Sequence, residues 1–325
     1  MLLVKTVAGG PGQTLRWVLL LALACLLLPA DDAWARVLRV GPDEALKVPS
    51  EAARIAQDGD TVEIVAADYT ADVASWRQNR LTLRGVDGRP HLRAAGRAAE
   101  GKAIWVIKGD EVLVENVEMS GTRVPGFAGA AIRAEGGKLT LRNVHFHDHQ
   151  MGILTNNNGR GELAIIDSEF DHNIVDYERY GKLGHNIYVG QIARFELRGS
   201  YIHDAVIGHQ VKSRARSNTI VGNRIVDGDG GSSYLIDLAE GGEATVRDNV
   251  LRKSERADNN AAISFAPEAN REAPGVLFVA GNRFTAEGGQ QAVFVRNFST
   301  TVEVVLSNNV LRGNVTPLEG LGRVR

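Results

Sequence analysis

The chain has 325 residues, with 36 glycines, 9 prolines and only 6% aromatic residues, a composition typical of a turn-rich β protein rather than a helical one. Its formal net charge of -2 gives no broad basic surface of the kind that nucleic-acid binding requires. The single cysteine, Cys25, falls in the N-terminal segment described next, so we expect a mature chain without disulfides.

The N-terminal segment has the pattern of a secretory signal peptide. Basic residues precede an apolar run at residues 17–28, and the small-x-small sequence Ala33-Trp34-Ala35 follows it. The apolar run is shorter than the roughly 20 residues that span a membrane. We therefore predict a signal peptide over residues 1–35 and a mature chain of residues 36–325 that is periplasmic or secreted and has no membrane span.

A strand-and-turn phrase recurs along the rest of the chain. Each copy alternates apolar and polar residues and closes on an apolar one, as in Leu141-Arg142-Asn143-Val144-His145-Phe146. The closing residues are Met119, Phe146, Phe170, Ile202, Ile225, Leu251, Phe284 and Leu311. Their spacing of 23 to 33 residues is typical of repeats that bury their apolar faces only by stacking on one another. The pattern predicts one all-β domain, a coil of stacked parallel strands.

Two further features belong to this coil. Residues 49–57 predict a short helix, with Ser50 as its N-cap, that covers the open N-terminal end of the core. Four asparagines share one repeat position and predict a ladder of hydrogen-bonded side chains in left-handed turn geometry: Asn223, Asn249, Asn282 and Asn309.

The entry into the coil resembles the pectate-lyase-like superfamily. Residues 49–57 are followed by Asp58-Gly59-Asp60-Thr61-Val62 and then by Leu81-Thr82-Leu83-Arg84-Gly85, and the repeats continue the resemblance over nearly all of the mature chain. The resemblance implies a single-stranded right-handed parallel β-helix over residues 36–325. It also implies a groove along the helix axis in which an extended polysaccharide lies.

Polar residues concentrate on three consecutive strands of the predicted coil. Strand alternation directs outward Asn186, Tyr188, Gln210, Lys212, Arg214 and Asp237. Counting to the turn that follows each strand aligns Tyr188, Lys212 and Asp237 across neighbouring strands, about 4.8 Å apart. This alignment predicts a candidate site on the outer face of the coil.

The residue types at this site fit proton abstraction beside a uronate carboxylate. β-Elimination needs a base for that proton, a cation on the carboxylate and an acid for the leaving oxygen, and C5-epimerisation shares the first step. We therefore predict as catalytic residues Lys212, Arg214, Tyr188, His209 and Asp237. We predict as substrate-binding residues Asn186, Gln210, Arg216 and Tyr234.

The sequence around Lys212-Ser213 resembles the chondroitinase-B-like and alginate lyases. The similar phrase continues through Asn218-Thr219-Ile220 and Gly222-Asn223, and the resemblance implies that Lys212 is the base. Those lyases carry an arginine on the next strand, where this chain has Asp237, and an aspartate beside a lysine favours its charged form. The alternative is an ion pair between Lys212 and Asp237 in a solvated basic patch.

A second polar group follows the closing residues of the repeats. It consists of His147, Asp171 and His203 at the first position and Asp148, His172, Asp204 and Asp227 at the second. Such stacks bind a metal, relay protons or simply hydrogen-bond to one another, and without a fixed ligand spacing we assign no metal site to them. We also assign none to His145, His147 and His149, because we expect the strand to end at Phe146.

Cofactor and function remain open at this stage. Calcium is the one cofactor that the sequence suggests, since Asp227-Gly228-Asp229-Gly230-Gly231 matches the first residues of a calcium loop, although it lacks the later ligands. The candidate functions are a lyase or epimerase of an acidic polysaccharide, a non-catalytic glycan binder, and a structural rod. The concentration of titratable groups favours the first two. We expect a monomer whose partner is a polysaccharide and not a nucleic acid.

Overall fold

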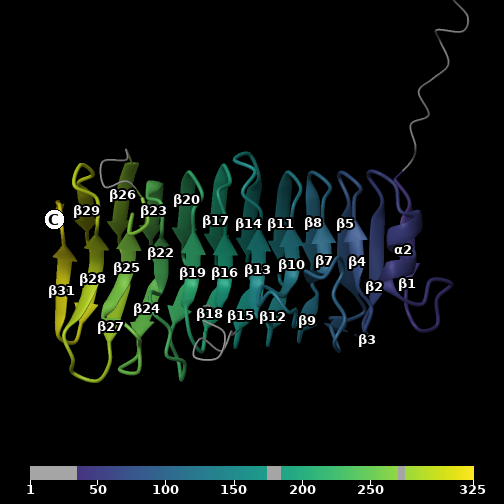
Figure 1. Ribbon diagram of the computed structural model, residues 1–325, viewed down its shortest axis with the longest axis horizontal. Coiled ribbons are helices and arrows are strands. Elements are labelled where there is room, and N and C mark those ends of the chain that lie inside the picture. Colours follow the sequence, from purple (N-terminus) through teal and green to yellow (C-terminus); the bar gives the residue numbers. More distant parts are fainter. Residues whose placement is uncertain (1–34, 174–183, 270–274) are drawn as a thin grey trace, which may run out of the picture. The chain divides into compact units, whose positions relative to one another are not determined.

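The structure is a computed structural model that describes residues 35–173, 184–269 and 275–325 (Figure 1). Residues Arg36–Arg325 form one compact unit. The predicted signal peptide lies outside the described residues, apart from Ala35. Within the described ranges, no helix has the length and apolar character needed to cross a membrane.

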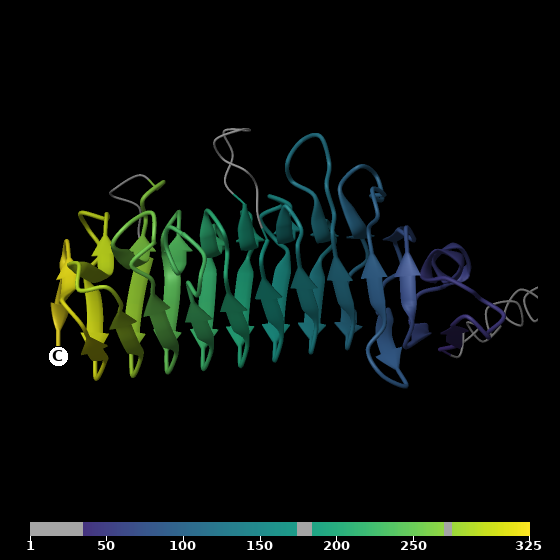
Figure 2. The ribbon, with the colours of Figure 1, turned by 90° about the horizontal axis from the view of Figure 1, so that it is seen from below.

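Three parallel sheets make up this unit, counted over the described residues (Figures 1 and 2). Sheet 1 contains, in order, β1 (Val37–Val40), β2 (Thr61–Val65), β5 (Thr82–Val86), β8 (Val112–Glu115), β11 (Lys138–Arg142), β14 (Glu162–Ile166), β17 (Arg194–Arg198), β20 (Ser217–Val221), β23 (Gly242–Arg247), β26 (Gly275–Ala280), β29 (Val304–Ser307) and β32 (Gly322–Val324). Sheet 2 contains β3 (Asp68–Thr70), β6 (His91–Arg93), β9 (Glu118–Ser120), β12 (His145–His147), β15 (Glu169–Asp171), β18 (Tyr201–His203), β21 (Arg224–Val226), β24 (Val250–Lys253), β27 (Arg283–Ala286) and β30 (Val310–Arg312). Sheet 3 contains β4 (Ala74–Trp76), β7 (Ala103–Ile107), β10 (Ala130–Ala134), β13 (Met151–Thr155), β16 (His185–Val189), β19 (His209–Ser213), β22 (Ile236–Leu238), β25 (Ala261–Phe265), β28 (Ala292–Asn297) and β31 (Val315–Glu319).

The chain visits the three sheets in turn and then starts the next coil, as the element order shows. This arrangement confirms the predicted all-β parallel β-helix. The eight closing residues of the repeat fall on one inward column of sheet 2, in which Met119 pairs with Phe146, Phe146 with Phe170, and so on to Leu311. The sequence period therefore equals one coil of the structure.

The core is a continuous apolar column inside the three sheets. Near the candidate site, the residues that alternate with those predicted to point outward are fully buried: Ile187, Val189, Val211, Ile236 and Leu238. Aromatic rings pack edge to face in the same interior, with Phe146 and Phe170 at 5.3 Å and Trp76 and Trp105 at 5.6 Å between ring centroids. Burial of this column stabilises the coil without any disulfide.

The one helix of the described residues, α2 (Pro49–Ile55), lies at the β1 end of the coil and packs against β1 and β4 (Figure 1). Pro49 and Ala52 are its buried residues, so the helix closes the N-terminal end of the core as predicted. The predicted N-cap is wrong. Val48 is the N-cap residue, and the backbone N–H of Ser50 instead donates to the Asp72 carboxylate at 3.0 Å.

The asparagine ladder is present in the structure. The side-chain amide of Asn223 donates to Asn249 at 3.0 Å, Asn249 to Asn282 at 2.9 Å, and Asn282 to Asn309 at 2.9 Å. The left-handed backbone conformation falls one residue earlier than predicted, on Gly222, Asp248, Gly281 and Asn308. The turn thus divides two requirements between neighbours, because one residue adopts the positive φ and the next supplies the amide.

Candidate functional site

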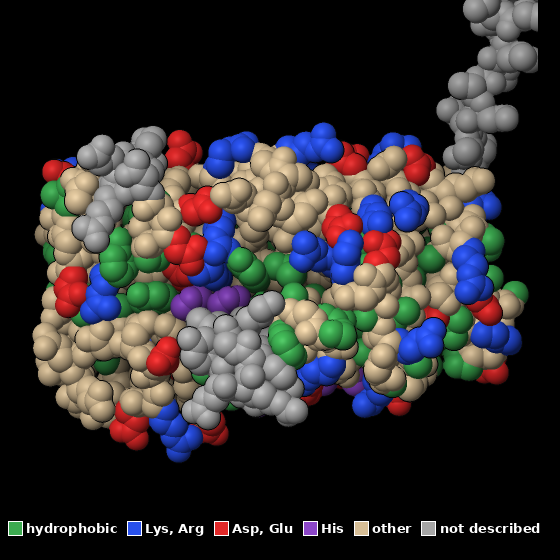
Figure 3. All heavy atoms as spheres, viewed as in Figure 1, with side chains coloured by type: hydrophobic (Ala, Val, Ile, Leu, Met, Phe, Trp, Pro, Cys, Tyr) green, Lys and Arg blue, Asp and Glu red, His purple; other side chains and the backbone are tan. Residues whose placement is uncertain are grey.

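Tyr188, Lys212 and Asp237 lie in one line on the outer face of sheet 3. The strand register pairs Tyr188 of β16 with Lys212 of β19, and Lys212 with Asp237 of β22. The predicted alignment of these three residues is therefore confirmed. Figure 3 shows basic, acidic and histidine side chains gathered on this face, over the part of the coil that Figure 1 labels β16 to β25.

Lys212 contacts two carboxylates. Its Nζ lies 3.0 Å from Asp237 Oδ2 and 2.5 Å from Glu268 Oε1, and the Lys212 side chain is only 9% exposed. Burial alone would lower the pKa of Lys212, but Asp237 and Glu268 raise it above its ordinary value. In this arrangement Lys212 is a charged ammonium group.

Glu268 joins Lys212 to Arg214 and was not found from the sequence. It follows β25, outside the repeat phrase, and its Oε2 accepts from Arg214 at 2.5 Å and 3.0 Å. Arg214 also donates to the hydroxyl oxygen of Tyr188, and its guanidinium lies 5.1 Å from the centroid of the Tyr188 ring. Glu268 therefore holds two cations side by side on the outer face of sheet 3.

His209 lies behind this group and is nearly buried. Its Nδ1 accepts the backbone N–H of Tyr234 at 3.1 Å, so the ring proton of the neutral imidazole is on Nε2. That nitrogen lies 3.5 Å from Asp237 Oδ2. Burial lowers the pKa of His209 to about 3, and the stacked ring of His185 lies 5.0 Å away between centroids. His209 is thus a neutral ring beside the Lys212 and Asp237 pair.

Tyr234 and Arg216 were also predicted to bind substrate. The Tyr234 side chain is partly buried, and burial and the nearby Asp237 raise the pKa of its hydroxyl. Arg216 is exposed and donates to the carbonyl of Gly159, away from Lys212. With Arg214, it lines an open groove of about 670 Å³. Arg216 therefore borders the ionised group without contacting Lys212.

The outward orientation predicted for Asn186 and Gln210 is wrong. Both side chains are completely buried, and the Asn186 amide donates to Gln210 Oε1 at 2.7 Å and to the carbonyl of His203 at 2.7 Å. Strand alternation fails at this corner of the coil. Asn186 faces inward next to Ile187, which is also in the core, so two successive side chains point to the interior.

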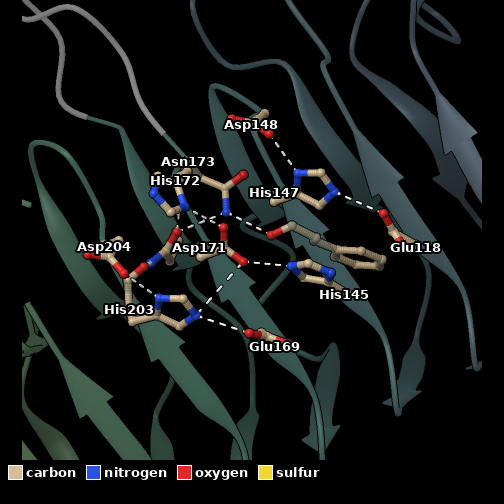
Figure 4. A network of polar contacts seen from close by, with 12 residues as sticks. Glu118, His145, His147, Asp148, Glu169, Asp171, His172, Asn173, His203 and Asp204 are labelled. Atoms are coloured by element: carbon tan, nitrogen blue, oxygen red, sulfur yellow. Dashed lines mark hydrogen bonds and ion pairs between the residues drawn. The ribbon is translucent and has the colours of Figure 1, made fainter. Parts of the chain in front are cut away.

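The second polar group lies on the outer face of sheet 2 (Figure 4). Six of its predicted members lie there: His147, Asp148, Asp171, His172, His203 and Asp204. Three residues that the repeat position did not predict join them, namely Glu118, His145 and Glu169. Asp227 does not belong to it, because it is buried 3.6 Å from Lys253. The predicted strand end at Phe146 is also wrong, since β12 continues to His147. His149 is fully buried, and its Nε2 contacts the carbonyl of Met119.

The fold and this geometry define a parallel β-helix with an ionised cluster on the outer face of one sheet. Residues 97–318 match the family described as "Right handed beta helix region", and the chain belongs to this family. This match confirms the predicted right-handed parallel β-helix.

Two solved structures share the fold. An alginate lyase from Paenibacillus sp. str. FPU-7 is 14% identical with a TM-score of 0.62, over 89% of this chain and 99% of that one. The pectate lyase Pel9A is 13% identical with a TM-score of 0.56, over 87% of this chain and 78% of that one. No curated protein sequence matches the chain. At these identities the likeness concerns the fold and not the chemistry.

Proposed function

We propose that the chain binds an acidic polysaccharide across sheet 3 and cleaves it by β-elimination beside a uronate carboxylate. The observation that carries this proposal is the convergence of Lys212 and Arg214 on the single carboxylate of Glu268. The Glu268 side chain is 40% exposed and comes from a connection after β25 rather than from the sheet. A uronate carboxylate has the same charge and shape, and in this proposal it replaces Glu268 when the polymer binds.

Arg214 and Tyr188 then supply two of the three functions that elimination requires. Arg214 neutralises the substrate carboxylate, which stabilises the negative charge that develops at the adjacent carbon. Because the guanidinium donates to the Tyr188 oxygen, the phenol hydrogen points elsewhere and serves as the donor to the leaving glycosidic oxygen.

Lys212 supplies the third function once Glu268 has been displaced. Asp237 then remains as its carboxylate partner at 3.0 Å, and burial raises the pKa of the Asp237 carboxyl. The proposed mechanism requires Asp237 to take a proton from Lys212 against the raised pKa of the lysine, and the neutral amine then removes the proton beside the substrate carboxylate. The C–H bond and the glycosidic C–O bond break as the C=C bond forms; Asp237 then releases its proton to water, and Tyr188 takes one back from water.

Glycan binding without cleavage is the second candidate. The observation that favours it is the pair of carboxylates on Lys212, which raise its pKa, because a charged lysine binds a uronate but abstracts no proton. For either function we propose that residues 1–35 are a signal peptide and that the mature chain acts in the periplasm or outside the cell, as a monomer.

The test measures the ultraviolet absorbance of the unsaturated uronate product, with alginate, polygalacturonate and glycosaminoglycans as substrates. In the proposed mechanism Lys212→Ala and Tyr188→Phe each lower cleavage about 10²–10⁴-fold. The matched control is Lys138→Ala, which removes an exposed lysine from β11 on sheet 1 and should leave cleavage unchanged. Polymer binding without product in the wild-type chain would support the second candidate. No binding to any of these polymers would overturn both.

Glu268→Gln tests the displacement step separately. The glutamine keeps the size of the side chain but removes the charge that competes with a substrate carboxylate. We expect acidic polymers to bind more tightly to this variant than to the wild-type chain, and neutral polymers to be unaffected. Weaker binding of acidic polymers would show that Glu268 positions the cations and does not occupy the carboxylate subsite.

A further inference from the structure

On the outer face of sheet 2, histidines and carboxylates alternate from strand to strand. Neighbours in this arrangement lie on adjacent strands but are separated in the sequence by a whole coil. One column of directly paired positions runs through Asp68, His91, Glu118, His145 and Glu169. The neighbouring column runs through Ser120, His147 and Asp171. This face belongs to a different sheet from the Lys212 cluster, and the proposed function does not use it.

Three side chains of this face converge on one point. His91 Nδ1 and His147 Nε2 each lie 3.2 Å from the same oxygen, Glu118 Oε1. The three ligand atoms all lie within 4.8 Å of one another. The side chains of His91, Glu118 and His147 are 12%, 27% and 18% exposed, so the point is sheltered but reachable from solvent.

In His91 and His147, the ring nitrogen that faces away from Glu118 already has a hydrogen-bond partner. Asp148 Oδ2 lies 2.6 Å from His147 Nδ1, and Ser120 Oγ lies 2.7 Å from His91 Nε2 (Figure 4 shows the His147 contacts). Both His147 nitrogens face ionised carboxylates, which only accept, and the shorter contact, 2.6 Å to Asp148 against 3.2 Å to Glu118, places the proton of a neutral His147 on Nδ1. The Nε2 lone pair then faces the Glu118 carboxylate. Two electron-rich atoms face each other at that point, and a cation between them resolves the repulsion.

The charge of the surroundings favours a cation as well. Over the described residues, no lysine or arginine nitrogen lies within 4.0 Å of the carboxylates of Glu118, Asp148, Glu169, Asp171 or Asp204, whose ionic partners are all histidines. Imidazoles offset this negative charge only when they are protonated. A bound divalent ion supplies two positive charges at the point where the ligands converge.

We propose that His91, Glu118 and His147 bind a divalent transition-metal ion of the zinc class. Two histidines and one glutamate form a known three-residue set for zinc with an open fourth position, and imidazole also suits copper, nickel and iron. Ligands about 2.0–2.2 Å from a tetrahedral ion lie roughly 3.3 Å apart, close to the two 3.2 Å separations here. Asp148 and Ser120 orient the ligating rings, as carboxylates and hydroxyls do around such ions.

The test is Zn²⁺ binding by the metal-stripped chain, measured by calorimetry, with the visible absorption of bound Co²⁺ as a second probe. We expect one Zn²⁺ per chain and no comparable Ca²⁺ binding, because Ca²⁺ takes six to eight oxygen ligands. His147→Gln should weaken Zn²⁺ binding at least about 100-fold, and Asp148→Asn about 10–100-fold. The matched control is His172→Gln, which removes an exposed imidazole that contacts Asp171 on the same face.

Three results overturn the proposal. One is an absence of Zn²⁺ and Co²⁺ binding by the wild-type chain, which would leave the face as a hydrogen-bonded ladder only. Another is equal binding by the wild-type chain and His147→Gln. The third is binding that survives His147→Gln but disappears in Asp171→Asn, which would place the ion in the neighbouring group of His145, Glu169 and Asp171. Circular dichroism of each variant shows that it is folded.

Discussion

Replacing Lys212 with methionine tests whether the ion pair at the candidate site is also structural. The two charged side chains are nearly buried, with Lys212 9% and Asp237 2% exposed. Methionine fills a similar volume but leaves the Asp237 carboxylate, as far as the described residues go, with the Ser264 hydroxyl at 2.6 Å and His209 Nε2 at 3.5 Å. Breaking a buried pair by removing one partner costs about 3–5 kcal/mol, and because two partners remain we expect the lower end, about 3 kcal/mol.

The double variant Lys212→Met/Asp237→Leu separates two costs: the loss of the attraction between the two charges, and the burial of the Asp237 charge without its lysine. Replacing a buried ion pair with apolar residues is often neutral or stabilising, so we expect this variant to recover most of the stability lost in Lys212→Met. Urea denaturation followed by circular dichroism measures both variants, with Lys138→Met as the control on sheet 1. A cost below about 1 kcal/mol for Lys212→Met is the value of an exposed pair, and it would refute the reasoning.

Two further predictions concern stability. Asn249→Ala leaves the buried backbone N–H of Asn223 without its acceptor at 2.9 Å, so we expect a loss of about 2–3 kcal/mol in urea denaturation, and a smaller one for Asn309→Ala at the last position of the ladder; equal losses would contradict this. Burial lowers the pKa of His149 to about 3, below the unfolded value near 6.5, so the unfolded chain binds more protons in this window and stability falls as the pH drops below about 6.5. His149→Gln should make that fall shallower by roughly 1 kcal/mol per pH unit, and an unchanged slope would show that His149 does not titrate in this way.

The repeat made most of the fold predictable. The closing residues give the inward column directly, because parallel strands stack in register and equivalent positions recur once per coil. The same counting aligned Tyr188, Lys212 and Asp237 correctly. Both successes rest on strand alternation, which is a local property of the chain.

Alternation also explains what was missed. It misplaced Asn186 and Gln210, because the chain turns a corner there and two successive side chains face inward. It gave no position for Glu268, which lies between repeats, where the sequence has no period to count from. His91 was also missed, because its coil precedes the first clear copy of the repeat phrase and offers no period to count from.

Both candidate sites follow from one electrostatic constraint of this fold. Equivalent side chains on adjacent strands lie about 4.8 Å apart, and two like charges at that distance cost roughly 3 kcal/mol at an effective dielectric constant of 20. Outward columns therefore alternate in character, as from His91 to Glu118 to His145 and from Lys212 to Asp237. Charged groups in such a column already have partners, so an anionic ligand must displace a carboxylate and a cation must enter between a carboxylate and its histidines. Glu268 offers the first exchange and Glu118 the second, which is why we expect single substitutions at these two residues to change ligand affinity in opposite directions.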